Sequence, residues 1–273
     1  MYDFEKPRGT KDNILRVRKI ESHLRLPTLP VGIKLFEKGD KVPEGLGEEP
    51  HFKGTYCQFM SQARFERCQV RKNYLIRRTT LICPYALGVL GFEEWGEEMA
   101  TGKHFGGVHF ESDAQAIKSQ SGLPKIEPYT IEAILVGPLM DLTVTPDLIG
   151  FSISPGMSNK VFDGAMWDSG EPMQMTYHNM CGICGTGTAE AYLEKSLTVN
   201  FPCHGGRRMG LFFDNELWVA LHNDFFDKWI SGMEKAYASG HAYPTGHYIT
   251  PNPGSPPHFK ILEWPDKIVP LDH

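Results

Sequence analysis

The sequence predicts a single α+β (mixed α/β) domain with a mixed sheet and packed helices, followed by an extended, proline-rich C-terminal arm. Helix-like and strand-like hydrophobic patterns are interspersed along the 273 residues without a regular βαβ alternation. After Gly240 this periodicity stops and prolines become frequent. We therefore divide the chain into an N-terminal helical extension (1–25), a main domain (26–240) and an arm (241–273).

The individual elements follow from spacing and from turn residues. Apolar residues one helical turn apart predict helices, and alternating or continuous short apolar runs predict strands. The predicted helices lie within 1–25, 55–66, 84–91, 113–122, 158–170, 187–197 and 224–240. The predicted strands lie within 31–35, 73–82, 130–139, 147–155, 197–203 and 216–223, and 171–180 is a further candidate. Ser112 and Asp224 stand where helix N-caps are expected.

The composition excludes several classes of protein. Hydrophobic residues make up 41% and charged residues 22% of the chain, and the net charge is −5, so no basic surplus indicates nucleic-acid binding. No apolar run approaches the roughly 18 residues of a membrane span. The N-terminal stretch "MYDFEKPRGTKDN" has no apolar signal region, which predicts a cytoplasmic protein. The arm is expected to pack over its own domain or to join two copies of the chain.

Six cysteines are the most chemically informative residues: Cys57, Cys68, Cys83, Cys181, Cys184 and Cys203. In a cytosolic chain they are expected to be thiols, metal ligands or catalytic groups rather than a disulfide framework. Cys181 and Cys184 form a Cys-x-x-Cys pair, which suits a redox couple, half of a metal site, or two ordinary thiols near a turn.

The residues after this pair do not complete a phosphate-binding motif. "GICGTGTAE" lacks the lysine of a P-loop, and Glu190 stands where a dinucleotide fingerprint needs its third glycine. Met173, Met175 and Met180 are interpreted as a core strand before the pair. Trp95 and Trp167 are interpreted as packing residues that could line a pocket.

Several blocks occur in an order that resembles a known family. These blocks are "LPVGIKLFEKGDKVPEG", "YCQFMSQAR", "CPYALGVLGF", "GTAEAYLEKSLTVNFPCHGGRRMG" and "DNELWVAL". The chain resembles, over roughly residues 25–238, the domain of unknown function 169 family (uncharacterised ArCR), which occurs in archaea and anaerobic bacteria. The resemblance implies a shared fold and recurring cysteines, and it implies no settled reaction.

The recurring cysteines of the family match Cys57, Cys83, Cys184 and Cys203, which leaves Cys181 as an extra thiol and an alternative ligand. Two departures stand out. The family's Cys-Pro-Gly-Gly is "CPYA" here, and its "GDRR" is "GGRR". Gly206 therefore replaces an acid whose carboxylate could contact a cysteine ligand. Cys68 lies in a polar run and is expected not to be a ligand.

This four-cysteine set leads to two hypotheses. In the first, the cysteines hold a 4Fe–4S cluster in a redox or lyase-type enzyme, or in an electron-transfer subunit, which acts on a small anionic or aromatic substrate or with a redox partner protein. In the second, the protein is a non-catalytic binding or accessory protein with a structural zinc at the same cysteines, or with free thiols and no cofactor.

Five further residues are candidates for substrate contacts: His204, Arg207, Arg208, His178 and Arg78. A guanidinium group binds a carboxylate or phosphate with two parallel hydrogen bonds, and histidine exchanges protons near neutral pH. The competing interpretation is structural, because adjacent arginines usually lie on a solvated face and a lone histidine is usually a hydrogen-bonded surface or core residue.

Overall fold

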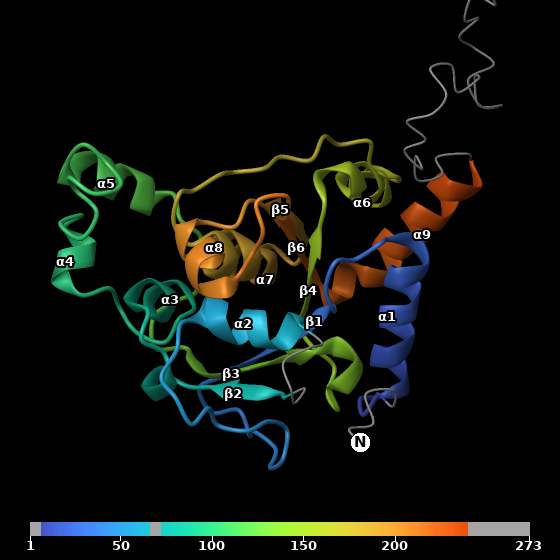
Figure 1. The fold of residues 1–273 in the computed structure, drawn as a ribbon, viewed down its shortest axis with the longest axis horizontal. Helices are drawn as coiled ribbons and strands as arrows, with labels where there is room; N and C mark the ends of the chain where they lie inside the picture. Colours follow the sequence, from blue (N-terminus) through green and yellow to red (C-terminus); the bar gives the residue numbers. More distant parts are fainter. Residues whose placement is uncertain (1–6, 66–71, 240–273) are drawn as a thin grey trace, which may run out of the picture.

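A six-stranded sheet organises the part of the chain that the computed structural model describes, residues 7–65 and 72–239 (Figure 1). Its strand order is β2-β3-β1-β4-β6-β5. The strands are β1 (Val31–Glu37), β2 (Tyr74–Ile76), β3 (Ile131–Pro138), β4 (Leu148–Ile153), β5 (Leu197–Asn200) and β6 (Leu217–His222). All the ladders are antiparallel. The α+β class is therefore confirmed, with an antiparallel sheet instead of the predicted mixed one.

Helices cover both faces of this sheet (Figure 1). The α-helices are α1 (Lys11–His23), α2 (Tyr56–Arg64), α3 (Pro84–Val89), α4 (Glu97–Ala100), α5 (Asp113–Ser121), α6 (Ser158–Met166), α7 (Glu190–Glu194), α8 (His204–Gly210) and α9 (Phe226–Ala238). A π-helix, η4, spans Gly182–Ala189. Within the described residues, no helix is long and apolar enough to cross a membrane.

The alternation of side chains along the strands divides the buried apolar residues into three clusters, two of which meet the opposite faces of β4 and β6. Ile149, Phe151 and Ile153 of β4 face α1, α6 and α9. Leu148 of the same strand and Trp218 of β6 belong to the other core, which contains α2, α3 and η4. Cys57, Cys181 and Cys184 lie in this second core and Cys83 packs against it, so the sheet separates them from the α1–α6–α9 layer.

Most predicted elements are confirmed, and three details are wrong. Asp224 does not cap α9, because its backbone N–H donates to His222 Nδ1 and the helix begins one short turn later. Residues 171–180 form no strand. They run irregularly from α6 to η4, with Met175 exposed and Met180 buried (Figure 1). Gly185–Thr188 is not a turn before a helix but part of η4, which continues directly into α7.

Two predictions fall outside the described residues. Cys68 lies between residues 66 and 71, and the arm occupies residues 241–273. The expectations that Cys68 is not a ligand and that the arm packs over the domain or a second copy remain predictions.

A buried ion pair ties α2 to the sheet. Arg64, at the end of α2, is fully buried, and its Nη1 donates to Glu216 Oε1 at 2.8 Å and to Ser152 Oγ at 3.0 Å. Its Nη2 donates to the Leu211 carbonyl oxygen at 2.6 Å, and the Phe212 ring lies 3.9 Å from the guanidinium carbon. This one side chain thus joins α2, β4 and the connection between α8 and β6.

Replacing Glu216 with leucine should destabilise the protein by about 3–5 kcal/mol, because the Arg64 charge would remain buried without its counterion. Urea unfolding measures this change. Glu49→Gln is the matched control, since it breaks an exposed ion pair with Arg77 and should cost less than about 1 kcal/mol. Equal losses in the two variants would show that the buried pair does not hold α2 in place.

Candidate thiol site

Four separate segments bring five cysteines close to one another, in or beside the second core. Cys57 lies in the first turn of α2, Cys83 precedes α3, Cys181 and Cys184 lie at η4, and Cys203 precedes α8. Cys83 is half-buried and the other four are buried, and all five are free thiols. The structure therefore brings together all four cysteines of the predicted set and the extra Cys181.

Cys184 is the common neighbour in this group. It lies close enough to Cys57, Cys83, Cys181 and Cys203 to be among the causes that raise the pKa of each of these four thiols. Cys57 also interacts with Cys203 and Cys83. We call these five residues (Cys57, Cys83, Cys181, Cys184 and Cys203) the thiol site.

Burial and repulsion from neighbouring thiolates raise the pKa values of Cys57, Cys83 and Cys203, which favours their protonated form when no cation is present. Burial is the main cause that raises the pKa of Cys57 well above its usual value, and the neighbouring thiolates of Cys203, Cys184 and Cys83 add to it. Burial, with Cys184, raises the pKa of Cys83 to about 11, and the same two causes raise the pKa of Cys203. A bound cation would reverse this preference, because metal binding releases thiol protons.

Backbone N–H groups oppose this effect at two of the cysteines. The amides of Ala86 and Tyr85 donate to Cys83 and lower its pKa, and those of Gly206, Gly182 and Gly205 do the same at Cys203. Both cysteines occupy the N-cap position of a short helix, where backbone N–H groups lack partners within the helix. Such donors stabilise a thiolate and tune a thiolate-bound metal centre.

The π-helix η4 delivers Cys184 into the site. Its wide turns are held by two threonine hydroxyls, from Thr186 to the Gly182 carbonyl at 3.0 Å and from Thr188 to the Ile183 carbonyl at 2.8 Å. Tyr56 of α2 shares a hydrogen bond of 3.2 Å with Thr188. π-Helical segments are rare and are frequent at functional sites. The "GTGT" run therefore supplies the hydroxyls of this helix, not a phosphate cradle.

Cys181 has a distinct position at the start of η4. Its backbone is left-handed, with φ of 57°, which is uncommon for a residue other than glycine. A hydrogen bond with Cys184 is the first cause that raises the pKa of its thiol, followed by burial. The extra cysteine is thus a direct partner of Cys184 rather than a remote spare thiol.

Two glycines permit the close packing that brings the segments together. A Cβ atom on Gly182 would lie 2.6 Å from the Phe201 carbonyl oxygen and 2.8 Å from the Cys203 nitrogen. A Cβ atom on Gly210 would lie 3.1 Å from Cβ of Cys57. The backbones of η4 and α8 therefore approach the other cysteine segments more closely than larger residues allow.

Within residues 7–65 and 72–239, no three His, Cys, Asp or Glu side chains are arranged to hold a metal ion as they stand. The thiol site is defined by the convergence and burial of its cysteines. Its donor atoms are soft sulfurs, the type that suits iron–sulfur clusters and zinc.

The arginine and histidine candidates are less closely tied to the thiol site. Arg78 pairs with Glu93 at 2.6 Å, and Arg207 donates to the Phe213 carbonyl at 2.8 Å and lies 3.3 Å from Asp214. Arg208 and His204 are exposed, and the His204 ring lies 5.9 Å from that of His109. His178 is half-buried, its pKa is lowered by burial, and its Nε2 has no hydrogen-bond partner among the described residues.

Tyr85 is a site residue that the sequence did not single out. Burial raises its pKa, and the thiols of Cys181 and Cys83 raise it further, which places its phenol beside the site. Its hydroxyl has no hydrogen-bond partner within the part of the chain described. The only signal in the sequence is its position two residues after Cys83 in "CPYA", where the family has glycine.

Fold and site together define a class: an α+β protein that gathers several free cysteines in the interior of one sheet-and-helix layer. The sequence model of the uncharacterised ArCR family, domain of unknown function 169, matches residues 19–232, and the chain belongs to this family. The match confirms the resemblance seen in the sequence. No curated protein and no solved structure matches the chain significantly.

Replacing Gly182 with alanine should destabilise the protein by about 1–3 kcal/mol, because the added methyl group collides with backbone atoms of Phe201 and Cys203. Thermal or urea unfolding measures the loss. Gly205→Ala is the control, since the nearest atom to its added Cβ would be Cys203 Sγ at 3.9 Å. If the two variants are equally stable, close packing of η4 against Cys203 does not hold the site together.

Proposed function

We propose that this protein is an iron–sulfur protein, in which Cys57, Cys83, Cys184 and Cys203 hold a 4Fe–4S cluster. It acts as a redox or lyase-type enzyme, or as an electron-transfer subunit, on a small anionic or aromatic substrate. The observation that carries the proposal is the convergence of these four thiols, from four separate segments, around Cys184.

The distribution of the four thiols among elements supports a cluster. Each comes from a different segment, so no two of them are constrained by adjacency in sequence. Iron–sulfur clusters take four cysteine thiolates, each on its own iron atom, and their ligands need not be adjacent in the chain. When bound, such a cluster transfers one electron or, with an open iron, polarises a substrate oxygen.

The surroundings of the thiols support the same assignment. The backbone amides at Cys83 and Cys203 donate to sulfur, and hydrogen bonds to sulfur are one means by which proteins set the potential of a cluster. Apolar residues such as Met180 and Phe212 pack in the same core and keep water away. Tyr85 places a phenol with an unused hydrogen-bond donor beside the sulfurs.

The alternative function is a non-catalytic binding or accessory protein whose cysteines hold a structural zinc or remain free. Zinc takes four thiolates in structural sites, so the same residues serve both cases. The two functions differ in what the site contains: a zinc site is colourless and redox-inactive, and free thiols carry no metal.

A cytoplasmic location and a small-molecule substrate or a redox partner protein complete the proposal. Thiols stay reduced in the cytoplasm, where free cysteines such as these persist without disulfides. A cluster with this role exchanges electrons with a partner or acts on a substrate beside it, and no nucleic-acid or membrane partner is proposed.

Protein purified without oxygen should be brown, with about four iron and four sulfide per chain and a visible absorption that dithionite bleaches. Metal and sulfide analysis together with the spectrum checks this. A colourless preparation with one zinc per chain would support the accessory function and contradict the cluster. A protein without metal after reconstitution with iron and sulfide would contradict both metal assignments.

Single substitutions to serine should separate the ligands from the extra thiol. Cys57→Ser, Cys83→Ser, Cys184→Ser and Cys203→Ser should each lower the iron content severalfold, whereas Cys181→Ser should retain most of it. Circular dichroism establishes that each variant is folded. If Cys181→Ser loses the iron and Cys184→Ser keeps it, the ligand within the Cys-x-x-Cys pair is the first cysteine.

A further inference from the structure

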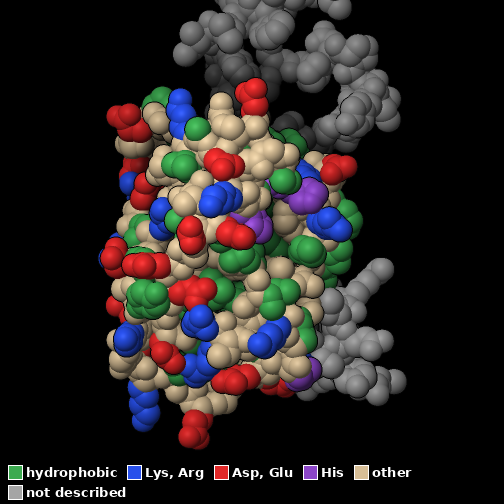
Figure 2. Space-filling view, turned by 90° about the vertical axis from the view of Figure 1, so that its left-hand side faces the viewer, with side chains coloured by type: hydrophobic (Ala, Val, Ile, Leu, Met, Phe, Trp, Pro, Cys, Tyr) green, Lys and Arg blue, Asp and Glu red, His purple; other side chains and the backbone are tan. Residues whose placement is uncertain are grey.

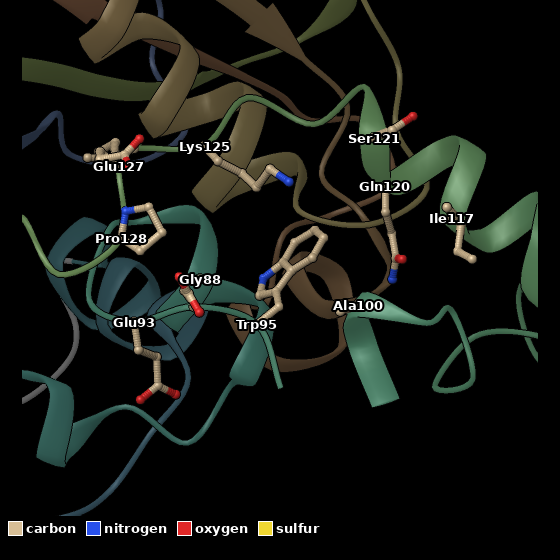
Figure 3. Close-up of a pocket in the computed structure, with 12 residues that line it drawn as sticks. Gly88, Glu93, Trp95, Ala100, Ile117, Gln120, Ser121, Lys125, Glu127 and Pro128 are labelled. Atoms are coloured by element: carbon tan, nitrogen blue, oxygen red, sulfur yellow. The ribbon is translucent and has the colours of Figure 1, made fainter. Parts of the chain in front are cut away.

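A cavity of about 560 Å³ opens between α3, α4 and α5 and the connection that leads to β3 (Figure 3). Its apolar walls include Ala100, Ile117 and Ile126, and Trp95 stands at its centre. This volume lies in the range of small-molecule sites, which are largely apolar and contain a few convergent polar groups. None of its residues belongs to the thiol site.

Two hydrogen-bond donors, on Lys125 and Gln120, face this cavity. The Lys125 ammonium group lies 4.5 Å from the centre of the Trp95 ring, and the Gln120 amide points toward the cavity from α5 (Figure 3). Gln120 is only 3% exposed, and its Nε2 has no hydrogen-bond partner among the described residues. The Trp95 Nε1 is buried as well, but its edge of the ring lies against Gly88 of α3 and not toward the cavity. A buried donor without an acceptor is costly, so the cavity is suited to a ligand that brings acceptors.

The charges around the cavity limit the ligand to a single negative charge. Lys125 is the only cation among the lining residues, and Glu93, Glu94 and Glu127 lie at the rim. Glu93 points away from the cavity and pairs with Arg78 (Figure 3). Acidic and basic side chains are interspersed on this face of the molecule (Figure 2). The single ammonium group pairs with one carboxylate of a ligand, and the carboxylates at the rim repel any further negative charge, as on a polyphosphate.

Gly88 allows the Trp95 ring to lie directly on α3. A Cβ atom at this position would overlap the indole ring. The Tyr85 ring of the same helix meets Trp95 edge to face, with ring centres 6.1 Å apart, and Tyr85 itself lies beside Cys83 and Cys181. Tyr85 thus contacts a residue of the cavity and also neighbours the thiol site.

We propose that this cavity binds a planar aromatic monocarboxylate. The carboxylate pairs with Lys125 and accepts a further hydrogen bond from Gln120, while the aromatic ring lies against Trp95 and the apolar walls. This assignment names the substrate class for the proposed function and relies on that function for the role of the ligand. Binding itself needs no metal.

The test is a titration of the full chain with benzoate, indole-3-carboxylate and nicotinate, followed by calorimetry. At least one of the three should bind with a dissociation constant below about 1 mM, and Lys125→Met should weaken it about tenfold to a hundredfold, since a charge-assisted hydrogen bond is lost. Gln120→Met should weaken it about threefold to tenfold. Methyl benzoate should bind more weakly than benzoate, and Lys125→Met should not change its affinity.

Lys118→Met is the matched control, because Lys118 is an exposed lysine of α5 that does not line the cavity, and it should leave affinity unchanged. Absence of binding by all three acids at 10 mM (about the weakest affinity that a charge-paired site would show) would overturn the proposal. The proposal would also be overturned if neither Lys125→Met nor Gln120→Met weakened binding. It would be overturned as well if inorganic phosphate bound as tightly as benzoate.

Iron content is measured on the same preparations, and the titration is repeated on metal-free protein. If the aromatic acids still bind to the metal-free protein, the cavity assignment stands even if the cluster proposal fails. If the protein contains iron but binds none of the aromatic acids, the cluster proposal stands and the cavity assignment is wrong.

Discussion

The arrangement of this protein depends on one constraint: thiols from four distant segments must lie side by side in an apolar core without forming disulfides. Thiolates repel one another, and burial disfavours their charge, so the site is stable only as protonated thiols or with a bound cation. The fold meets this constraint with close backbone packing. Gly182 permits the approach of η4 to Cys203, and Gly210 permits the approach of α8 to Cys57.

The buried Arg64 is the second part of the same arrangement. It is bound to Glu216, Ser152 and the Leu211 carbonyl, and it fixes the α2 end opposite Cys57 to the sheet and to the chain that leaves α8. Burial lowers the pKa of this guanidinium, and its contact with Glu216 opposes that effect. Removal of one partner of a buried ion pair is costly, because the other charge stays buried without a counterion. The pair therefore fixes α2, which carries Cys57, relative to the chain that leaves α8, the helix that follows Cys203.

Much of the fold and the cysteine set could be predicted, because the signals are local or positional. The spacing of Ile20 and its neighbours indicates α1, and the continuous apolar run in 131–138 indicates β3. The π-helix could not be predicted, since threonine hydroxyls that bond carbonyls four and five residues back have no periodic signature. "GTGT" instead suggests a turn.

The residues of the proposed ligand cavity could not be recognised from the sequence, because only tertiary contacts bring them together. Gln120 and Lys125 are ordinary helix and loop residues by pattern, and only the fold places them beside Trp95. Paired arginines in the sequence fit either anion binding or a structural role, and in the structure Arg207 donates to the Phe213 carbonyl oxygen. A motif reports which side chains are present, and packing decides what they face.

X-ray absorption at the iron and zinc edges of anaerobically purified protein tests the central claim most directly, because it reads the atoms around the metal. A 4Fe–4S cluster on the thiol site predicts a first shell of sulfur around iron, with iron–iron scattering beyond it. A zinc ion with four sulfur neighbours and no iron scattering, or iron in a shell of oxygen and nitrogen, would contradict it.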